Sequence, residues 1–399
     1  MTQRLIVDQQ EFEEFCSHIR SAGEVAFDTE FVSEYTYRPE LCLLQFATAE
    51  RSAAVDPFAV PDLSSWWKIM SGGETLVVIH GGREEVRYCM RYAGAPPGRV
   101  VDVQVAEGLQ SRSFPLSYSA LVARVLGKRT HGKETRTDWR RRPLSGAQIE
   151  YAIEDVQFLL QVWDTQRKSL DSRQRLPWAE AEFERMVREI DDESTRENWR
   201  RLPGILSLNS RELAIVRELY EWREREGERR DRLVRKVLRD DLVVELARRQ
   251  PRDQNDLLAT RDMNRSDYRR VADDMLEAIS RAVELPDSKL PPVLRPRNDQ
   301  DEHILAQLLS IALANRCSQA EVAMGLVGTN ADLKHLVRWH VYGERDGQPP
   351  RLTQGWRAEV CGDLLTDVLA GKIALRINDP HSDHPLVFER LDGKPRQVE

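Results

Sequence analysis

The chain lacks several features that would assign it to other classes of protein. It has no run of about 20 apolar residues, which excludes a membrane-spanning helix. Its 5 cysteines are scattered and never form a Cys-x-x-Cys pair, so the sequence indicates buried free thiols rather than a disulfide framework or a zinc site. The N-terminal segment MTQRLIVDQQEFEEF carries acids where a signal peptide needs an apolar stretch. These absences predict a soluble, cytoplasmic protein without a membrane partner.

An excess of positive charge is also lacking. The chain has 59 Lys and Arg against 66 Asp and Glu, a formal charge of −7, which excludes a generic polyanion-binding surface over the whole molecule. One local segment, residues 128–142, has seven Lys or Arg against two acids, a net of +5. The 399 residues are 41% hydrophobic, which is enough for two to four domains with real cores.

Hydrophobic patterning predicts an α/β domain followed by helical domains. Apolar segments at 25–27, 41–47, 53–55 and 76–79 are typical of strands, and helices are expected at 84–93, 102–109, 119–126 and, without a break, 145–163. The alternation indicates one central sheet. Beyond residue 164 the composition indicates a helical connector, Arg/Glu-rich helices, a proline-rich linker, more helices and an irregular tail after residue 379.

Two pairs of polar residues stand where they can do chemistry together. Asp28 and Glu30 end the first strand at positions i and i+2, so both carboxylates project to one side and can hold a divalent cation. Tyr151 and Asp155 are four residues apart on an expected helix and share a face. Each pair alone is also common on solvated surfaces or half-buried helix faces.

Taken together, the motifs are far more specific. FDTEF, VIHGGREEV, VDVQVA, RTDW, RPL and YAIED follow one another in a pattern that resembles the DEDD superfamily of 3′→5′ exonucleases. Tyr151 places the resemblance in the tyrosine branch, and within it the chain is similar to the ribonuclease D family. Residues 208–283 resemble the helicase and ribonuclease D C-terminal (HRDC) domain.

The resemblance implies a fold and a domain order. The fold is α/β, a ribonuclease H-like exonuclease domain with a mixed central sheet, followed by all-α C-terminal domains. The expected divisions are the exonuclease domain at 1–165, a helical connector at 166–205, an HRDC domain at 206–285, a linker at 286–298, a second, diverged HRDC-like domain at 299–378, and the tail at 379–399.

The resemblance also implies the catalytic residues. Asp28, Glu30, Glu85 and Asp155 would ligate two Mg²⁺ or Mn²⁺ ions, with no organic cofactor, and Tyr151 would orient the attacking water. Glu85 departs from the family, which has aspartate five residues after the histidine of this turn. The extra methylene predicts reduced activity or an altered metal preference. Glu84 is the alternative for this role.

Aromatic and basic residues near the motifs are candidates for binding the substrate. Phe31 is a candidate base-stacking residue, with core packing as the alternative. Lys133, Arg136 and Arg140, with Arg141 and Arg142, are candidates for phosphate contacts, with a solvated face as the alternative. His80 is expected to be structural rather than a general base.

The leading hypothesis is a monomeric, metal-dependent 3′→5′ exoribonuclease that trims structured RNAs with a single-stranded 3′ end, such as tRNA precursors. Two alternatives stay open at this point. One is a DNA 3′→5′ exonuclease with the same chemistry. The other is an RNA-binding protein whose nuclease site is weakened at Glu85.

Overall fold

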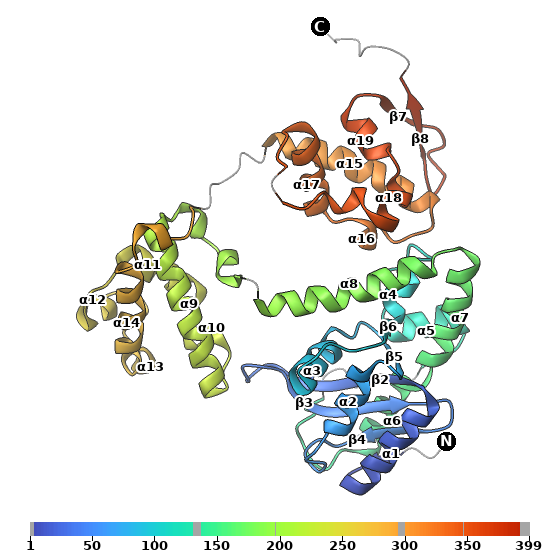
Figure 1. The fold of residues 1–399 in the computed structure, drawn as a ribbon, viewed down its shortest axis with the longest axis horizontal. Helices are drawn as coiled ribbons and strands as arrows, with labels where there is room; N and C mark the ends of the chain where they lie inside the picture. The colour runs from blue at the N-terminus through green and yellow to red at the C-terminus, as the bar shows by residue number, and fades with distance from the viewer. Residues whose placement is uncertain (1–3, 131–136, 196, 294–299, 346, 392–399) are drawn as a thin grey trace.

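The computed structural model describes residues 4–130, 137–195, 197–293, 300–345 and 347–391. Figure 1 shows an N-terminal α/β domain, a helical domain after the long helix α8 (Leu176–Thr195), and a third, mostly helical domain that ends the chain. Among the helices within these ranges, none combines the length and apolar character that a membrane crossing requires.

A mixed six-stranded sheet forms the centre of the first domain. Its strands lie in the order β1-β4-β3-β2-β5-β6, that is Leu5–Ile6, Ser52–Val55, Glu40–Ala47, Glu24–Val32, Leu76–Ile79 and Val100–Asp102. β3 runs antiparallel to both of its neighbours, β2 and β4, whereas β1 runs parallel to β4, and β5 runs parallel to both β2 and β6. The four strands expected from the sequence are present, and the short β1 and β6 were not anticipated.

The face that each residue of β2 occupies follows from strand geometry. Phe27 packs against α1 (Gln9–Ala22) and α2 (Ser64–Gly72), whereas Ala26 belongs to the cluster on the other face, with α7 (Leu159–Ser172). Because successive side chains point to opposite faces, Asp28 and Glu30 project to the same face as Ala26. The chemistry of the strand therefore lies on the face covered by α6 (Gly146–Gln157) and α7.

Two helices differ from the expected ones. The helix expected over 145–163 is broken at Phe158 into α6 and α7, because a tyrosine hydroxyl enters its hydrogen-bond ladder, as described below. The helix expected from residue 102 begins one residue later, as α4 (Val103–Gly108). Asp102 ends β6 instead, and its carboxylate accepts from the backbone N–H of Gln104.

The second domain has its own hydrophobic core. It contains α9 to α14, which are Ser210–Arg230, Val234–Val237, Asp240–Arg249, Gln254–Leu258, Ser266–Arg269 and Ala272–Val283. The loop after β2 contacts α9: the Tyr37 hydroxyl donates to Glu224 at 2.9 Å, and Arg38 pairs with Glu228 at 2.7 Å. This domain therefore touches the segment that immediately follows the Asp28-Thr29-Glu30 motif.

The third domain ends in a hairpin. Its helices are α15 to α19, at Gln300–Gln319, Met324–Val327, Asn330–Val341, Gly355–Cys361 and Leu364–Leu369. The tail expected to be irregular after residue 379 contains β8 (Leu386–Arg390), antiparallel to β7 (Ile373–Ile377). The expectation was wrong because Leu375 and Phe388 pack against the helical core, which favours a paired structure there.

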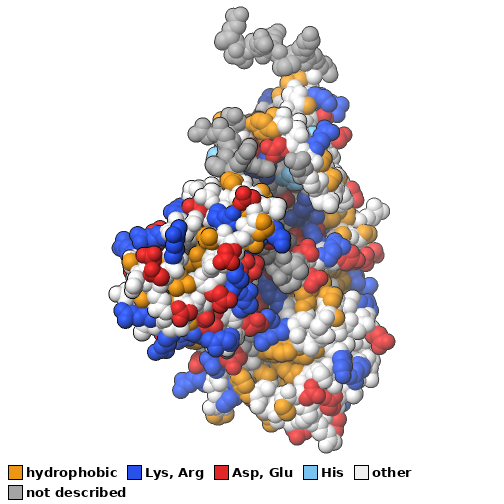
Figure 2. Space-filling model, turned by 60° about the vertical axis from the view of Figure 1, so that its left-hand side comes forward, with side chains coloured by type: hydrophobic (Ala, Val, Ile, Leu, Met, Phe, Trp, Pro, Cys, Tyr) orange, Lys and Arg blue, Asp and Glu red, His pale blue; other side chains and the backbone are white. Residues whose placement is uncertain are grey.

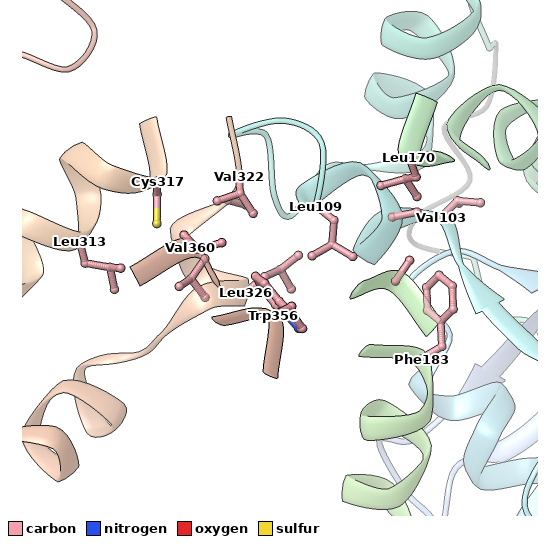
Figure 3. Packing of buried hydrophobic residues seen from close by; sticks show 14 of the residues in the cluster. Val103, Leu109, Leu170, Phe183, Leu313, Cys317, Val322, Leu326, Trp356 and Val360 are labelled. Carbon is pink, nitrogen blue, oxygen red and sulfur yellow. The ribbon is translucent and has the colours of Figure 1, made fainter. Parts of the chain in front are cut away.

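The third domain is packed onto the first by a shared core. Figure 3 shows Leu109 of the first domain next to Leu326 and Trp356 of the third, with Val103 and Phe183 on the other side of Leu109 in the same apolar cluster. The backbone N–H of Ala323 also donates to the carbonyl of Gly108 at 2.7 Å. α8, expected as a connector, contributes Phe183 to this core and is therefore a structural part of both domains.

Candidate active site

β2 brings Asp28 and Glu30 to the end of its neighbour β5. β5 pairs with β2 only from Glu24 to Ala26, while β3 continues alongside to Val32. Beyond β5 the chain turns at His80 and enters α3 (Arg83–Ala93). The two carboxylates therefore stand where one neighbouring strand has ended and the first turn of α3 approaches.

Glu85 reaches the motif from that first turn. Its side chain is 4% exposed, and the Thr29 hydroxyl donates to its carboxylate at 2.5 Å. Gly82 makes the approach possible, because a Cβ there would lie 2.6 Å from Ile79 and 2.9 Å from the Glu85 carboxylate. Glu84 pairs with Arg87 instead. The structure thus brings Glu85 to the motif and leaves Glu84 away from it.

α6 supplies the remaining members. A capping box between Ser145 and Gln148 starts the helix, which then presents Tyr151 and Asp155 on one face. The Tyr151 hydroxyl lies near the Asp155 carboxylate and partly offsets the rise in the pKa of that acid. The Tyr151 ring also lies against Trp139, with ring centroids 6.2 Å apart.

The four carboxylates repel one another. Burial, followed by the charges of Glu85, Asp155 and Glu30, raises the pKa of Asp28 well above its usual range. Burial and the charges of Asp155 and Glu85 raise the pKa of Glu30 to about 8. Burial is also the largest cause that raises the pKa of Glu85 to about 7 and that of Asp155 to about 6.

This electrostatic arrangement suits divalent cations. The charged groups that contribute most to the shifts of these four pKa values are themselves acids. Carboxylate oxygens are the donors that hard cations such as Mg²⁺ prefer, and bound cations would remove the repulsion. Among the described residues, no three His, Cys, Asp or Glu side chains lie close enough together to hold one metal ion. The match between this site and divalent cations therefore rests on the charge and the donor type of the carboxylates.

A pocket of about 650 Å³ opens beside the cluster. Its wall includes the proposed catalytic residues Glu30 and Tyr151, together with Phe31, Tyr35 and Arg140. Phe31 is half-buried and meets Tyr88 edge-on at 6.3 Å, so it belongs partly to the core and partly to the pocket. Arg140 pairs with Glu40 at 2.9 Å while it lines the pocket.

Tyr35 was missed by the sequence reading, although its side chain is 69% exposed at this pocket. The one signal available was an aromatic residue within a polar loop between two strands. Lys133 and Arg136 lie outside the described residues. Arg142 is not a free phosphate contact, because its guanidinium binds the Asp56 carboxylate at 2.6 and 2.8 Å.

His80 has the structural role expected for it. Its Nε2 lies 3.0 Å from the Leu116 carbonyl oxygen, and burial lowers the pKa of the ring. The site therefore combines the four carboxylates of Asp28, Glu30, Glu85 and Asp155 with the phenol of Tyr151, while His80 is held by a backbone carbonyl.

Comparisons with known proteins identify the family of the chain. A 3′–5′ exonuclease family model matches residues 3–171, and an HRDC domain model matches residues 212–279. The protein named Ribonuclease D from Acidiphilium cryptum is 31% identical over 365 residues, covering 90% of this chain and 91% of that protein. The Ribonuclease D of Nitrobacter hamburgensis is 30% identical over 376 residues, covering 94% and 97%.

A solved structure matches over almost the whole chain. The crystal structure of Escherichia coli RNase D, described as an exoribonuclease involved in structured RNA processing, has a TM-score of 0.80 and 25% sequence identity. The match covers 93% of this chain and 99% of that one, so it includes the helical domains as well as the sheet.

Proposed function

Since the chain belongs to the ribonuclease D family and is a 3′→5′ exoribonuclease, we propose that it trims the single-stranded 3′ ends of structured RNAs, such as tRNA precursors, by two-metal-ion hydrolysis. One arrangement supports the mechanism: Asp28 and Glu30 on β2, Glu85 on α3 and Asp155 on α6 lie near enough that the charges of Glu85 and Asp155 raise the pKa values of Asp28 and Glu30. The two alternatives, a DNA exonuclease and a non-enzymatic RNA-binding protein, are disfavoured because the relatives are ribonucleases.

The proposed division of labour follows from the chemistry of each group. Asp28, Glu30, Glu85 and Asp155 would hold the metal ions. Bound divalent ions supply an activated water and stabilise charge on the leaving 3′ oxygen. Tyr151 orients the water, since burial and the nearby carboxylates raise the pKa of its hydroxyl and keep it protonated.

The pocket beside the cluster would receive the 3′-terminal nucleotides. Tyr35 offers an exposed ring to a base, and Phe31 closes the pocket next to Glu30. Arg140 is the described cation of this wall, and Lys133 and Arg136 remain candidates from the sequence. Figure 2 shows basic and acidic side chains interleaved on the face it presents, which favours local phosphate contacts over one continuous basic surface.

The proposed assignment is tested with an RNA hairpin that carries a labelled 5′ end and a single-stranded 3′ tail. We expect a ladder that shortens from the 3′ end with Mg²⁺ or Mn²⁺ and disappears with EDTA or with Asp155→Asn. Asp164→Asn is the matched control, since Asp164 is an exposed acid on α7 that pairs with Lys168. The control should cleave like the wild type.

Substrate and mechanism are separated by further arms of the same assay. A tRNA precursor with a 3′ extension should be shortened to its folded body, and a DNA of the same sequence should be cut far more slowly. Cleavage that persists in EDTA, or in Asp155→Asn, would refute the metal assignment. Equal rates on RNA and DNA would refute the substrate class.

A further inference from the structure

Phe158 interrupts the helix that carries the catalytic Asp155. α6 ends at Gln157 and α7 begins at Leu159, and Phe158 between them has φ −106° and ψ −4°. In a continuous helix the backbone N–H of Phe158 would donate to the carbonyl of Glu154. A sharp break of this kind needs a cause, such as a side chain inserted into the hydrogen-bond ladder.

The inserted group is the hydroxyl of Tyr118. It donates to the Glu154 carbonyl at 2.6 Å and accepts from the Phe158 N–H at 3.3 Å. The hydroxyl therefore bonds both partners of one missing helical hydrogen bond, and the Phe158 N–H also contacts the Val156 carbonyl. Since Asp155 follows Glu154 directly, the break lies within the turn that carries the carboxylate.

Tyr118 is itself held by the turn around His80, whose ring lies 6.0 Å from its own. It is the first residue of α5 (Tyr118–Leu126), whose N-cap is Ser117. The preceding carbonyl, that of Leu116, lies 3.0 Å from His80 Nε2 and accepts from the Gln104 amide at 2.8 Å. His80 opens the turn that leads to Glu85. The chain of contacts thus runs from that turn, through Tyr118, to the last turn of α6.

We propose that Tyr118 is a positioning residue for catalysis: its hydroxyl holds open the break between α6 and α7 and so sets where the Asp155 carboxylate lies beside the acids of β2. The inference rests on the proposed metal-binding role of Asp155. It gives the His80 turn a function in addition to packing, because that turn fixes where the Tyr118 hydroxyl lies. Tyr118 itself does not act on the substrate.

The first test is Tyr118→Phe, which removes the hydroxyl and keeps the ring. Without the bridge, the Phe158 N–H is free to bond the Glu154 carbonyl directly, which straightens the helix and moves Asp155. We expect Mn²⁺ affinity, measured by calorimetry without RNA, to fall about tenfold, and kcat to fall with KM for RNA nearly unchanged. The melting temperature should drop by no more than about 4 °C.

Tyr88→Phe is the matched control. Tyr88 is a buried tyrosine of the same domain whose hydroxyl has no hydrogen-bond partner among the described residues. It should leave Mn²⁺ affinity and kcat unchanged. Raising the Mn²⁺ concentration should restore part of the rate of Tyr118→Phe. Because Mn²⁺ also stabilises the folded state, the melting temperature of the metal-free variant is what separates this effect from a defect in folding.

Asp155→Asn distinguishes the two ways in which the inference fails. If Asp155→Asn loses Mn²⁺ binding but Tyr118→Phe binds Mn²⁺ and cleaves RNA like the wild type, the positioning role of Tyr118 is refuted and the proposed function stands. If Asp155→Asn also binds Mn²⁺ normally, the metal site itself is wrongly assigned and both proposals fall.

Discussion

Replacing Glu85 with glutamine should stabilise the metal-free protein at pH 8 while it abolishes activity. Glu85 is 4% exposed, and burial raises its pKa from the ordinary 4.5 to about 7. A pKa difference of this size means that keeping Glu85 ionised lowers the free energy of unfolding by about 3 kcal/mol. Glutamine removes the charge and keeps an oxygen that can accept from Thr29.

The sign of the effect depends on pH. Between pH 4.5 and 7 the folded state holds the Glu85 proton that the unfolded state has released, so stability falls as the pH rises through this window. At pH 8 the gain from Glu85→Gln is about 2 kcal/mol once the weaker, neutral hydrogen bond to Thr29 is included. At pH 5, where folded Glu85 is already protonated, the gain should nearly vanish.

Thermal unfolding in EDTA at the two pH values measures this difference. For a domain of this size, 2 kcal/mol corresponds to a rise of about 4–8 °C. Glu84→Gln is the matched control, since Glu84 is partly exposed and paired with Arg87, and its substitution should change stability little at either pH. If the melting temperature of Glu85→Gln at pH 8 is equal to or lower than that of the wild type, the ionised Glu85 carboxylate does not destabilise the metal-free fold and the reasoning is refuted.

Four further predictions follow from the same contacts. Glu85→Asp should keep the rate of single-turnover cleavage within about tenfold of the wild-type rate, whereas Glu85→Gln should lower it at least 100-fold. The reason is that the charge at this position matters more than the length of the side chain. Equal losses of rate in the two variants would refute this. The rise in melting temperature caused by Mn²⁺ should be larger at pH 8.5 than at pH 6. At the lower pH the metal must displace protons from carboxylates whose pKa values reach about 8. A rise that is the same at both pH values would contradict this. Arg38→Glu should loosen the contact between the first and second domains, which X-ray scattering would detect as a larger radius of gyration. Adding Glu228→Arg should restore the smaller radius, because it restores the ion pair with the charges exchanged. A double variant as expanded as the single one would argue against this ion pair. Gly108→Val should lower the melting temperature by several degrees, because a Cβ at Gly108 would lie 2.6 Å from Leu326. Adding Leu326→Ala should recover part of this loss. If the two substitutions change the melting temperature additively, they do not act through that contact.

The sequence alone identified the parts of this protein that depend on local pattern. Alternation of apolar segments marked β2 to β5, and the order of FDTEF, VIHGGREEV and YAIED indicated the exonuclease family, which the comparisons confirm. These features are readable because the apolar pattern of a strand or helix repeats over a few residues, and each motif lies within one short segment. The assignment of Asp28, Glu30, Glu85 and Asp155 as metal ligands stays a prediction.

Other features depended on residues far apart in the chain. Thr29 and Glu85 are 56 positions apart, and only the fold shows that this hydroxyl holds the longer side chain. The break at Phe158 has no signal of its own, because the group that causes it, the Tyr118 hydroxyl, lies 40 positions earlier.

Burial decided the remaining roles. The composition of residues 128–142 suggested a row of phosphate contacts, but Arg142 is bound to Asp56 in the fold, whereas Tyr35 stands exposed at the pocket. Sequence therefore determined which elements and motifs this protein has. Tertiary structure decided which side chains meet, because contact and desolvation arise only when distant segments pack together.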